Sequence, residues 1–248
     1  MALENRLARL AVLIDADNTS AKIADGLFEE IAKIGEASAR RIYGDFSKSH
    51  LKPWADVLAK HAIIPQQQFA YTVGKNSTDI ALVIDAMDLL HNGRFDGFCL
   101  VSSDSDFTRL AARIREHGTD VYGFGEEKTH ESFRQACRRF IYTENLISVP
   151  KGEVGKDLAK PLRQPSAVVP LIKKVLSQNA GEDGWVGLSA VGTQLSNLSS
   201  DFDPRTYGYR KLSDLVKKTG QFEVEAAGGV LRIRRKIANQ MAANAQKK

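Results

Sequence analysis

Apolar residues in the first 150 positions follow two alternating patterns. Short apolar runs with the length of buried strands lie at 10–14, 39–43, 63–69, 97–102 and 120–124. Between these runs, apolar residues recur every three or four positions, as at Ile23, Leu27, Ile31 and Ile34, which indicates helices. Strands that alternate with helices predict an α/β fold in which helices cover both faces of a mainly parallel sheet.

Three further helices are expected between the strands, at 49–60, 78–91 and 107–118. The second of these is apolar almost without interruption from Ile80 to Ile84, so we expect it to be buried on most sides. Ligands of parallel sheets bind beyond the carboxyl ends of the strands. The residues that follow each strand are therefore the first candidates for a functional site.

The pattern changes after residue 148. Residues 149–164 are rich in Pro, Gly and Lys and lack apolar periodicity, which is typical of a linker. Three short helices and a hairpin are then expected, at 168–176, 188–198, 205–218 and 222–233. This order predicts a second, smaller winged-helix (α+β) domain. The expected division is a domain at 1–148, a linker at 149–164, a domain at 165–236 and a flexible tail at 237–248.

Composition changes this picture mainly through charge. The chain of 248 residues, 43% of them hydrophobic, is long enough for one large core and a smaller one. Residues 151–248 hold 17 Lys and Arg against 9 Asp and Glu, which leaves 18 against 21 for residues 1–150. An acidic first half and a basic second half favour a metal-dependent domain joined to a module that meets a polyanion. A simple solvated surface is the alternative explanation for the basic half.

The two cysteines, Cys99 and Cys137, both fall in apolar segments. No disulfide framework and no cysteine-based zinc site is therefore expected. Only about five apolar residues precede Asp15, and no later run approaches twenty, so we expect neither a signal peptide nor a membrane span. These features predict a soluble, cytoplasmic protein without a membrane partner.

Three short segments that carry aspartate are the strongest chemical signal. They are LIDADN at 13–18, STDIAL at 77–82 and SSDSDF at 102–107. Two of them follow predicted strands, so Asp15, Asp104 and Asp106 are expected at the carboxyl edge of the sheet. The third opens a helix, from which Asp79 is placed to face the same pocket.

Ionised carboxylates a few ångströms apart repel strongly, so a pocket of them requires a cation, a proton or heavy solvation. A hard divalent cation with oxygen ligands, Mg²⁺ or Mn²⁺, is the simplest solution. Structural roles stay open for several residues, namely Asp17 and Asn18 in a turn, Asp79 as a first-turn acid, and Ser102 and Ser103 as helix caps.

The second half offers a candidate nucleic-acid surface, because it combines cations for phosphates with flat rings for bases. The candidates are Arg205, Tyr207, Tyr209, Arg210 and Lys211 around the third helix, and Arg232 and Arg234 on the hairpin. In the first half, Lys75 is placed to neutralise a scissile phosphate. The alternatives are that the two tyrosines pack inside the domain, that Lys75 is an ordinary surface lysine, and that the winged helix binds a protein.

Several enzyme classes lack their signatures. None of the five histidines has HxxxH or HxH spacing, and neither a P-loop nor a G-x-S-x-G motif is present. The run from Asp15 to Thr19 does satisfy the D-x-D-x-T pattern of haloacid-dehalogenase-like phosphatases, with Asp15 as nucleophile and Asp17 as general acid. The helix expected from Ile23 leaves no room for the flap insertion of those enzymes.

LIDADN, the spacing from Lys75 to Asp79, and SSDSDF together resemble the NYN domain, a branch of the PIN-like metal-dependent ribonucleases that includes bacterial LabA-like proteins. The resemblance covers roughly residues 8–148 and implies a PIN-like fold. It also implies a catalytic, metal-binding site made of Asp15, Asp79, Asp104 and Asp106, with Asn18 beside it.

A second resemblance covers the back half. WVGLSAVGTQL at 185–195 and FDPRTYGYRKLSDLV at 202–216 are similar to the OST-HTH or LOTUS domain, a winged helix associated with RNA and with partner proteins. The pairing of these two domain types is itself known in RNA regulation. RNA, single-stranded or structured, is therefore the expected partner.

These inferences predict a metal-dependent ribonuclease, with endonuclease action favoured. Attack by water would leave a 5′-phosphate and a 3′-hydroxyl. Two alternatives are a non-catalytic RNA-binding adaptor with a vestigial acidic pocket and the phosphatase. The natural RNA, the number of metals, a protein partner of the winged helix and a homo-oligomer all stay open.

Overall fold

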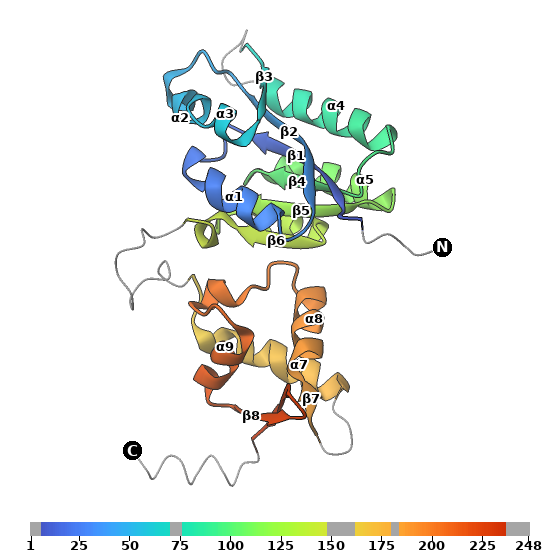
Figure 1. The fold of residues 1–248 in the computed structure, drawn as a ribbon, viewed down its shortest axis with the longest axis vertical. Helices are drawn as coiled ribbons and strands as arrows, with labels where there is room; N and C mark the ends of the chain where they lie inside the picture. The colour runs from blue at the N-terminus through green and yellow to red at the C-terminus, as the bar shows by residue number, and fades with distance from the viewer. Residues whose placement is uncertain (1–5, 70–75, 148–161, 180–183, 237–248) are drawn as a thin grey trace. The chain divides into compact units, whose positions relative to one another are not determined.

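The computed structural model divides the chain into two compact units, Met1–Ser148 and Val149–Lys248, which we describe separately (Figure 1). The structure describes residues 6–69, 76–147, 162–179 and 184–236. Lys75, most of the expected linker and the tail at 237–248 lie outside the described residues.

The first unit is an α/β domain with a six-stranded parallel sheet, which confirms the predicted fold class. Its strands are β1 (Arg9–Asp15), β2 (Glu36–Gly44), β3 (Ile64–Gln67), β4 (Gly97–Val101), β5 (Asp120–Gly125) and β6 (Arg139–Tyr142). Its helices are α1 (Ala24–Ile31), α2 (Lys52–Ala55), α3 (Leu58–His61), α4 (Ser77–His91), α5 (Thr108–Glu116) and α6 (Glu131–Ala136). Short 3₁₀ helices are η1 (Ala21–Ile23), η2 (Ser49–Leu51), η3 (Ser105–Phe107) and η4 (Thr143–Asn145).

The strand order, β3-β2-β1-β4-β5-β6, creates a crevice at the carboxyl ends of β1 and β4. The chain runs outward from β1 to β3, returns to β4 beside β1, and then continues outward to β6 on the other side. The connections that leave β1 and β4 therefore diverge, and ligands of such sheets bind where they separate. Asp15 is the last residue of β1 and Ser102 directly follows β4, so two acidic segments meet there.

Asp15 lies on the face of the sheet that α4 covers. The residues of β1 that pack in the core cluster with α1 are Leu10, Val12 and Ile14. Side chains alternate along a strand, so Asp15 points to the opposite face. Its partner on β2, Tyr43, donates a hydrogen bond to Asp85 of α4, and Arg41 on the same face of β2 pairs with Asp85 as well. Figure 1 shows α1 and α4 on opposite sides of the sheet.

The elements of the first unit differ from those expected in two places. The helix expected at 49–60 is divided into η2, α2 and α3, and Ala62 ends this segment in the left-handed conformation with a φ of 50°. The sequence pattern did not predict α6 and β6, which have six and four residues. Both are too short for apolar periodicity to reveal them.

The second unit contains helices and a small antiparallel sheet. Its elements are η5 (Pro165–Val168), α7 (Val169–Asn179), β7 (Val186–Gly187), α8 (Leu188–Leu198), η6 (Pro204–Tyr207), α9 (Leu212–Thr219), β8 (Phe222–Ala227) and β9 (Val230–Arg235). The sheet order is β7-β9-β8. The expected third helix is split into η6 and α9, because Gly208 between them has a φ of 83°, which glycine adopts without strain. None of the helices in the described ranges has the length and apolarity needed to cross a membrane.

Candidate active site and nucleic-acid interface

Asp15 is a buried carboxylate whose hydrogen-bonding capacity is fully used. Its side chain is 0% exposed. Oδ1 accepts from the backbone nitrogens of Asp17 (3.1 Å) and Asn18 (3.3 Å), and Oδ2 accepts from Asn18 Nδ2 (2.8 Å) and Ser102 Oγ (2.7 Å). A carboxylate has about four acceptor positions, so all of them are engaged. Burial raises the pKa of Asp15, while the hydrogen bonds from Ser102 and Asn18 oppose that rise.

Ser102 connects the two acidic segments that follow β1 and β4. Its hydroxyl donates to Asp15 Oδ2 and accepts from the backbone nitrogen of Asp104 at 3.0 Å. Asp104 Oδ1 in turn accepts from the backbone nitrogen of Asp106 at 2.9 Å and caps η3. A chain of hydrogen bonds therefore fixes the ends of the two strands relative to each other.

Asp79 stands where the negative charges of the site converge. It lies in the first turn of α4 and is partly buried. Burial is the largest cause that raises its pKa, and the charges of Asp15, Asp104, Asp17 and Asp106 raise it further, to about 6. Carboxylates from three separate segments thus act on one another at the carboxyl edge of the sheet.

The donor set has the chemistry of a Mg²⁺ or Mn²⁺ site, because it consists of carboxylate oxygens. Within the described part of the chain, however, no three His, Cys, Asp or Glu side chains lie close enough together to hold a metal ion. Asp104 uses only one oxygen internally, and the carboxylates of Asp79 and Asp106 accept no hydrogen bond from a described residue. Asp15, by contrast, would have to release Asn18 or Ser102 to bind a cation directly.

The turn after β1 forms one wall of a cleft of about 360 Å³. Two hydrogen bonds hold this turn: Thr19 Oγ1 donates to the carbonyl of Val101 (3.3 Å), and Trp54 Nε1 donates to the carbonyl of Thr19 (2.9 Å). The cleft lining includes Asp17, Asn18, Lys22, His50, Trp54 and Lys128. Positive side chains therefore stand beside the acidic site, as a phosphodiester substrate requires.

Several of these residues could not be predicted from the sequence. Trp54 and His50 come from the segment around η2 and α2, more than thirty residues after Asp15, and no motif marks them. The His50 ring lies 3.4 Å from Asp17 Oδ1. Of the two serines left open as caps, Ser102 bridges strands, and Ser103 Oγ accepts from the backbone nitrogen of Glu126 at 2.9 Å.

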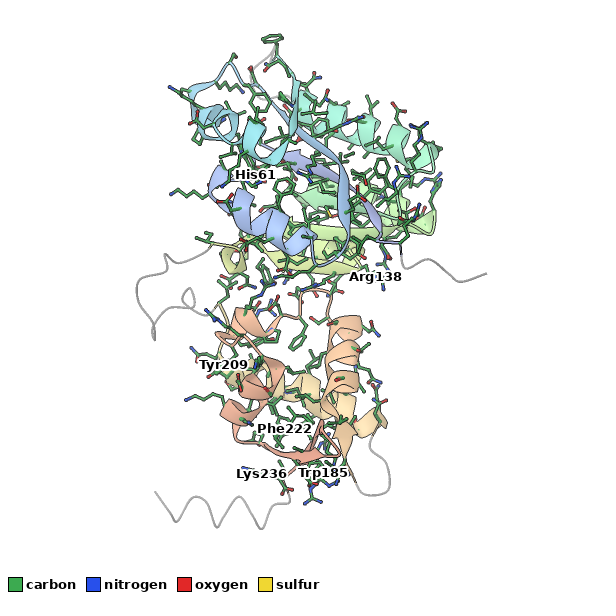
Figure 2. All side chains as sticks on the ribbon, viewed as in Figure 1. His61, Arg138, Trp185, Tyr209, Phe222 and Lys236 are labelled. Atoms are coloured by element: carbon green, nitrogen blue, oxygen red, sulfur yellow. The ribbon has the colours of Figure 1, made fainter. Side chains whose placement is uncertain are left out.

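Two of the residues predicted to bind RNA in the second unit are engaged inside it. Tyr207 is only 5% exposed and packs against Phe202, with ring centroids 6.2 Å apart, so its ring is not available to stack on a base. Arg205 forms an ion pair with Asp203 at 2.6 Å. Tyr209, labelled in Figure 2, is partly exposed and partly packed against the hydrophobic core of the unit.

The hairpin arginines are also paired. Arg232 forms an ion pair with Glu225 (2.9 Å) and Arg234 with Glu223 (2.6 Å). Both guanidinium groups lie over the Trp185 ring, at 4.9 and 4.6 Å from its centroid. Among the seven candidates of this unit, the exposed cations are Arg210 and Lys211.

Comparison with known proteins identifies two domain types. The NYN domain family model matches residues 9–146, and the OST-HTH/LOTUS domain model matches residues 163–229. A curated relative, "Uncharacterized protein MJ0482" of Methanocaldococcus jannaschii, is 27% identical over 123 residues. This match covers 48% of each protein, so the chain spans about half the length of that relative.

Two solved structures are similar to parts of the chain. A protein of unknown function from Vibrio parahaemolyticus, VPA0982, is 17% identical, with a TM-score of 0.47, over 56% of this chain and 94% of its own. An uncharacterized protein from gene locus NE0665 of Nitrosomonas europaea is 32% identical, with a TM-score of 0.29, over 36% and 90%.

The NYN match extends over more than half of the chain and includes all the aspartates of the acidic site. NYN domains belong to the PIN-like nuclease superfamily, whose members generally use divalent metals. OST-HTH/LOTUS domains are associated with RNA binding. The chain belongs to the NYN domain family and carries an OST-HTH/LOTUS domain after its NYN domain.

Proposed function

We propose that this chain is a metal-dependent ribonuclease that hydrolyses RNA phosphodiester bonds at the carboxyl edge of the NYN sheet. The observation that carries the proposal is the convergence of four negative charges on Asp79; burial and, after it, these charges raise the pKa of that carboxyl to about 6. Such repulsion costs folding free energy, and a bound cation relieves it. A cluster of carboxylates that repel one another is therefore expected where the cluster binds a cation.

In the proposed site, Asp79, Asp104 and Asp106 would hold Mg²⁺ or Mn²⁺ through their free oxygens, which must come closer together than they lie here. The ion, when bound, lowers the pKa of water and offsets charge on the scissile phosphate. Asp15 stands behind these ligands, and Asn18 and Ser102 fix its orientation. Below about pH 6 Asp79 holds a proton, which weakens it as a ligand.

The proposed substrate is single-stranded or structured RNA, cut endonucleolytically. Lys22 in the cleft beside the acidic site is proposed to contact its phosphates. Lys128 in the same cleft is paired with Glu126 at 2.8 Å. Lys75, outside the described residues, keeps its proposed contact with the scissile phosphate. The OST-HTH/LOTUS domain adds affinity for RNA.

A non-catalytic RNA-binding adaptor is the second candidate. It is favoured by the four internal hydrogen bonds of Asp15 and by the absence of a three-ligand group among the described residues. The phosphatase has less support, because a fully buried, hydrogen-bonded Asp15 is poorly placed to attack phosphorus. In addition, η1 begins at Ala21, which leaves no room for a flap insertion.

Replacement of Asp104 tests the proposal. Asp104→Asn should lower Mn²⁺-dependent cleavage of labelled RNA by about 100-fold or more, a loss typical of removing a group that stabilises transition-state charge. RNA binding in EDTA and the circular dichroism spectrum should stay unchanged. Asp88→Asn is the matched control, because Asp88 is an exposed acid on α4 and does not belong to the site.

Full activity of Asp104→Asn would remove the catalytic assignment. If the unmodified chain binds RNA but cleaves none with either Mg²⁺ or Mn²⁺, the adaptor is the better description. Trapping of a phosphoaspartate at Asp15 would instead support the phosphatase.

A further inference from the structure

The cations of the second unit divide into two groups, those neutralised by acidic side chains and those left without a partner. On the hairpin, Arg232 stands directly opposite Glu225 and Arg234 opposite Glu223 in the β8–β9 pairing. Both pairs are closed by ion pairs, of 2.9 and 2.6 Å. Two of the three arginines of β9 are therefore neutralised, whereas the exposed Arg235 donates to the carbonyl of Lys173.

The ring of Trp185 also contacts the guanidinium groups of Arg232 and Arg234. Their guanidinium carbons lie 4.9 and 4.6 Å from its ring centroid, within the range of cation–π attraction. A phosphate that recruited Arg232 or Arg234 would have to compete with both the glutamate and the ring. Arg205 and Arg163 are likewise paired, with Asp203 and Asp201.

Around α9 the situation is the opposite. Arg210, Lys211, Lys217 and Lys218 are all exposed, and none of their side chains forms an ion pair or hydrogen bond with a described residue. With 3.6 residues per turn, Lys211 at the N-cap, Lys217 and Lys218 fall within about one third of the circumference of α9. The buried residues of α9, Leu215 and Val216, occupy its other side.

The end of β9 extends this basic face. The backbone nitrogen of Lys236 donates to the carbonyl of Gln221 at 3.2 Å, and Gln221 follows the C-terminal cap of α9. This bond places the backbone of Lys236 beside Gln221, three residues after Lys218. Figure 2 labels Lys236, Tyr209 and Trp185 in the second unit.

We propose that the exposed face of α9 is the RNA-phosphate surface of the second unit, and that the paired hairpin arginines, Arg232 and Arg234, are not part of it. The surface, called here the α9 face, consists of Arg210, Lys211, Lys217, Lys218 and Lys236. Unpaired cations bind phosphates with a gain from counterion release, whereas paired ones must first lose a partner. Tyr209, next to Arg210, packs in part against the core of the unit, and the exposed part of its ring is proposed to meet an unstacked base, which favours single-stranded RNA. This inference rests on the proposed function only in so far as it takes RNA as the partner.

Two double variants of the full chain, each of which removes two positive charges, test the inference. Lys217→Gln/Lys218→Gln changes the α9 face and Arg232→Gln/Arg234→Gln changes the hairpin. Binding to a labelled single-stranded RNA of mixed sequence is measured in EDTA, where no metal-dependent cleavage takes place, over a series of salt concentrations. Thermal melting shows whether each variant is folded at the temperature of the assay.

The α9 variant should bind roughly 25-fold more weakly near 0.1 M salt, because each phosphate contact contributes about 0.7 to the slope of log K against log salt. Its slope should be shallower by about 1.4. The hairpin variant should keep the affinity of the unmodified chain within about twofold and keep its slope, since its arginines make no phosphate contact.

Asp214→Asn gives an independent check that does not depend on the hairpin. Asp214 is an exposed acid on the α9 face, between Lys211 and Lys218. Its replacement should strengthen RNA binding, because one repulsive charge is removed. Equal losses in the two double variants, or an α9 variant with unchanged affinity and slope, would overturn the proposal. An unchanged α9 variant would instead point to a protein partner for this domain.

These measurements are separate from those that test the nuclease. If the α9 face binds RNA but no cleavage is found with Mg²⁺ or Mn²⁺, the ribonuclease proposal fails and this inference holds. If cleavage is found and the α9 variant binds RNA normally, the ribonuclease proposal holds and this inference fails.

Discussion

Ser102 is the residue on which the geometry of the acidic site depends most directly. Its hydroxyl donates to the buried Asp15 and accepts from the backbone of Asp104. Removal of one partner leaves a buried carboxylate oxygen short of a donor, which costs more than the net value of an exposed hydrogen bond.

Ser102→Ala should therefore lower the free energy of unfolding by about 1–3 kcal/mol. Urea denaturation is the measurement. Ser105→Ala is the matched control, because Ser105 is exposed and its side chain has no partner among the described residues. If the two variants are equally stable, the hydrogen bond from Ser102 to Asp15 contributes no more to stability than a hydrogen bond from water.

Asp79 should make the stability of the chain depend on pH. Its pKa is about 6 in the folded chain, above the ordinary value of 3.8, so the folded state binds a proton more tightly than the unfolded state. The contribution of Asp79 to the free energy of unfolding is therefore fully present at low pH and is lost as the pH rises from about 4 to about 6.

Asp79→Asn lacks this titration and should be the more stable protein near pH 7, by about 1 kcal/mol once solvent screening of this partly exposed group is considered. At pH 4 the difference should be smaller. Melting temperatures in EDTA across this pH range measure it, with Asp88→Asn as control. A difference that does not change with pH would show that the neighbouring charges do not act on Asp79.

At the scale of elements, two helical glycines have opposite surroundings. A Cβ on Gly26 of α1 would lie 2.1 Å from the carbonyl oxygen of Leu146, a backbone atom that cannot turn away. A Cβ on Gly192 of α8 would meet only Leu212 Cδ2, at 3.4 Å, which is ordinary contact.

The same substitution should therefore have opposite effects in the two helices. Gly192→Ala should stabilise the second unit by about 0.5–1 kcal/mol, because alanine loses less conformational freedom in a helix. Gly26→Ala should destabilise the first unit by several times that amount, since α1 must move away from Leu146. Denaturation of each variant measures both effects, and a stable Gly26→Ala protein would show that α1 shifts easily.

Element length decided which elements could be predicted. α4 has fifteen residues and a nearly continuous apolar stretch, so its position was predicted to within a residue at its start. The expectation that it is buried on most sides was wrong, because Ile80 and Ile84 are exposed. The split of the expected third helix of the second unit depends on a single backbone angle at Gly208. Periodicity does not encode such an angle.

At the scale of the whole molecule, the division into two units predicts a division of labour. A chain without residues 165–235 should still cleave RNA in a metal-dependent reaction. Its affinity for RNA should fall about tenfold or more, and the salt dependence of binding should become flatter, because phosphate contacts are lost. A chain that lacks only 237–248 is the control. Unchanged RNA binding after the larger deletion would assign RNA recognition to the NYN domain alone.

The sequence by itself determined the alternation of strands and helices and the position of aspartates after β1 and β4, because both are local patterns along the chain. It also indicated which residues are basic. Only the tertiary structure decided which of these charges are available. Ser102 and Asn18 occupy the oxygens of Asp15, and glutamates neutralise Arg232 and Arg234, through contacts across strands or between loops. Such contacts depend on strand register and packing, which a local pattern does not specify.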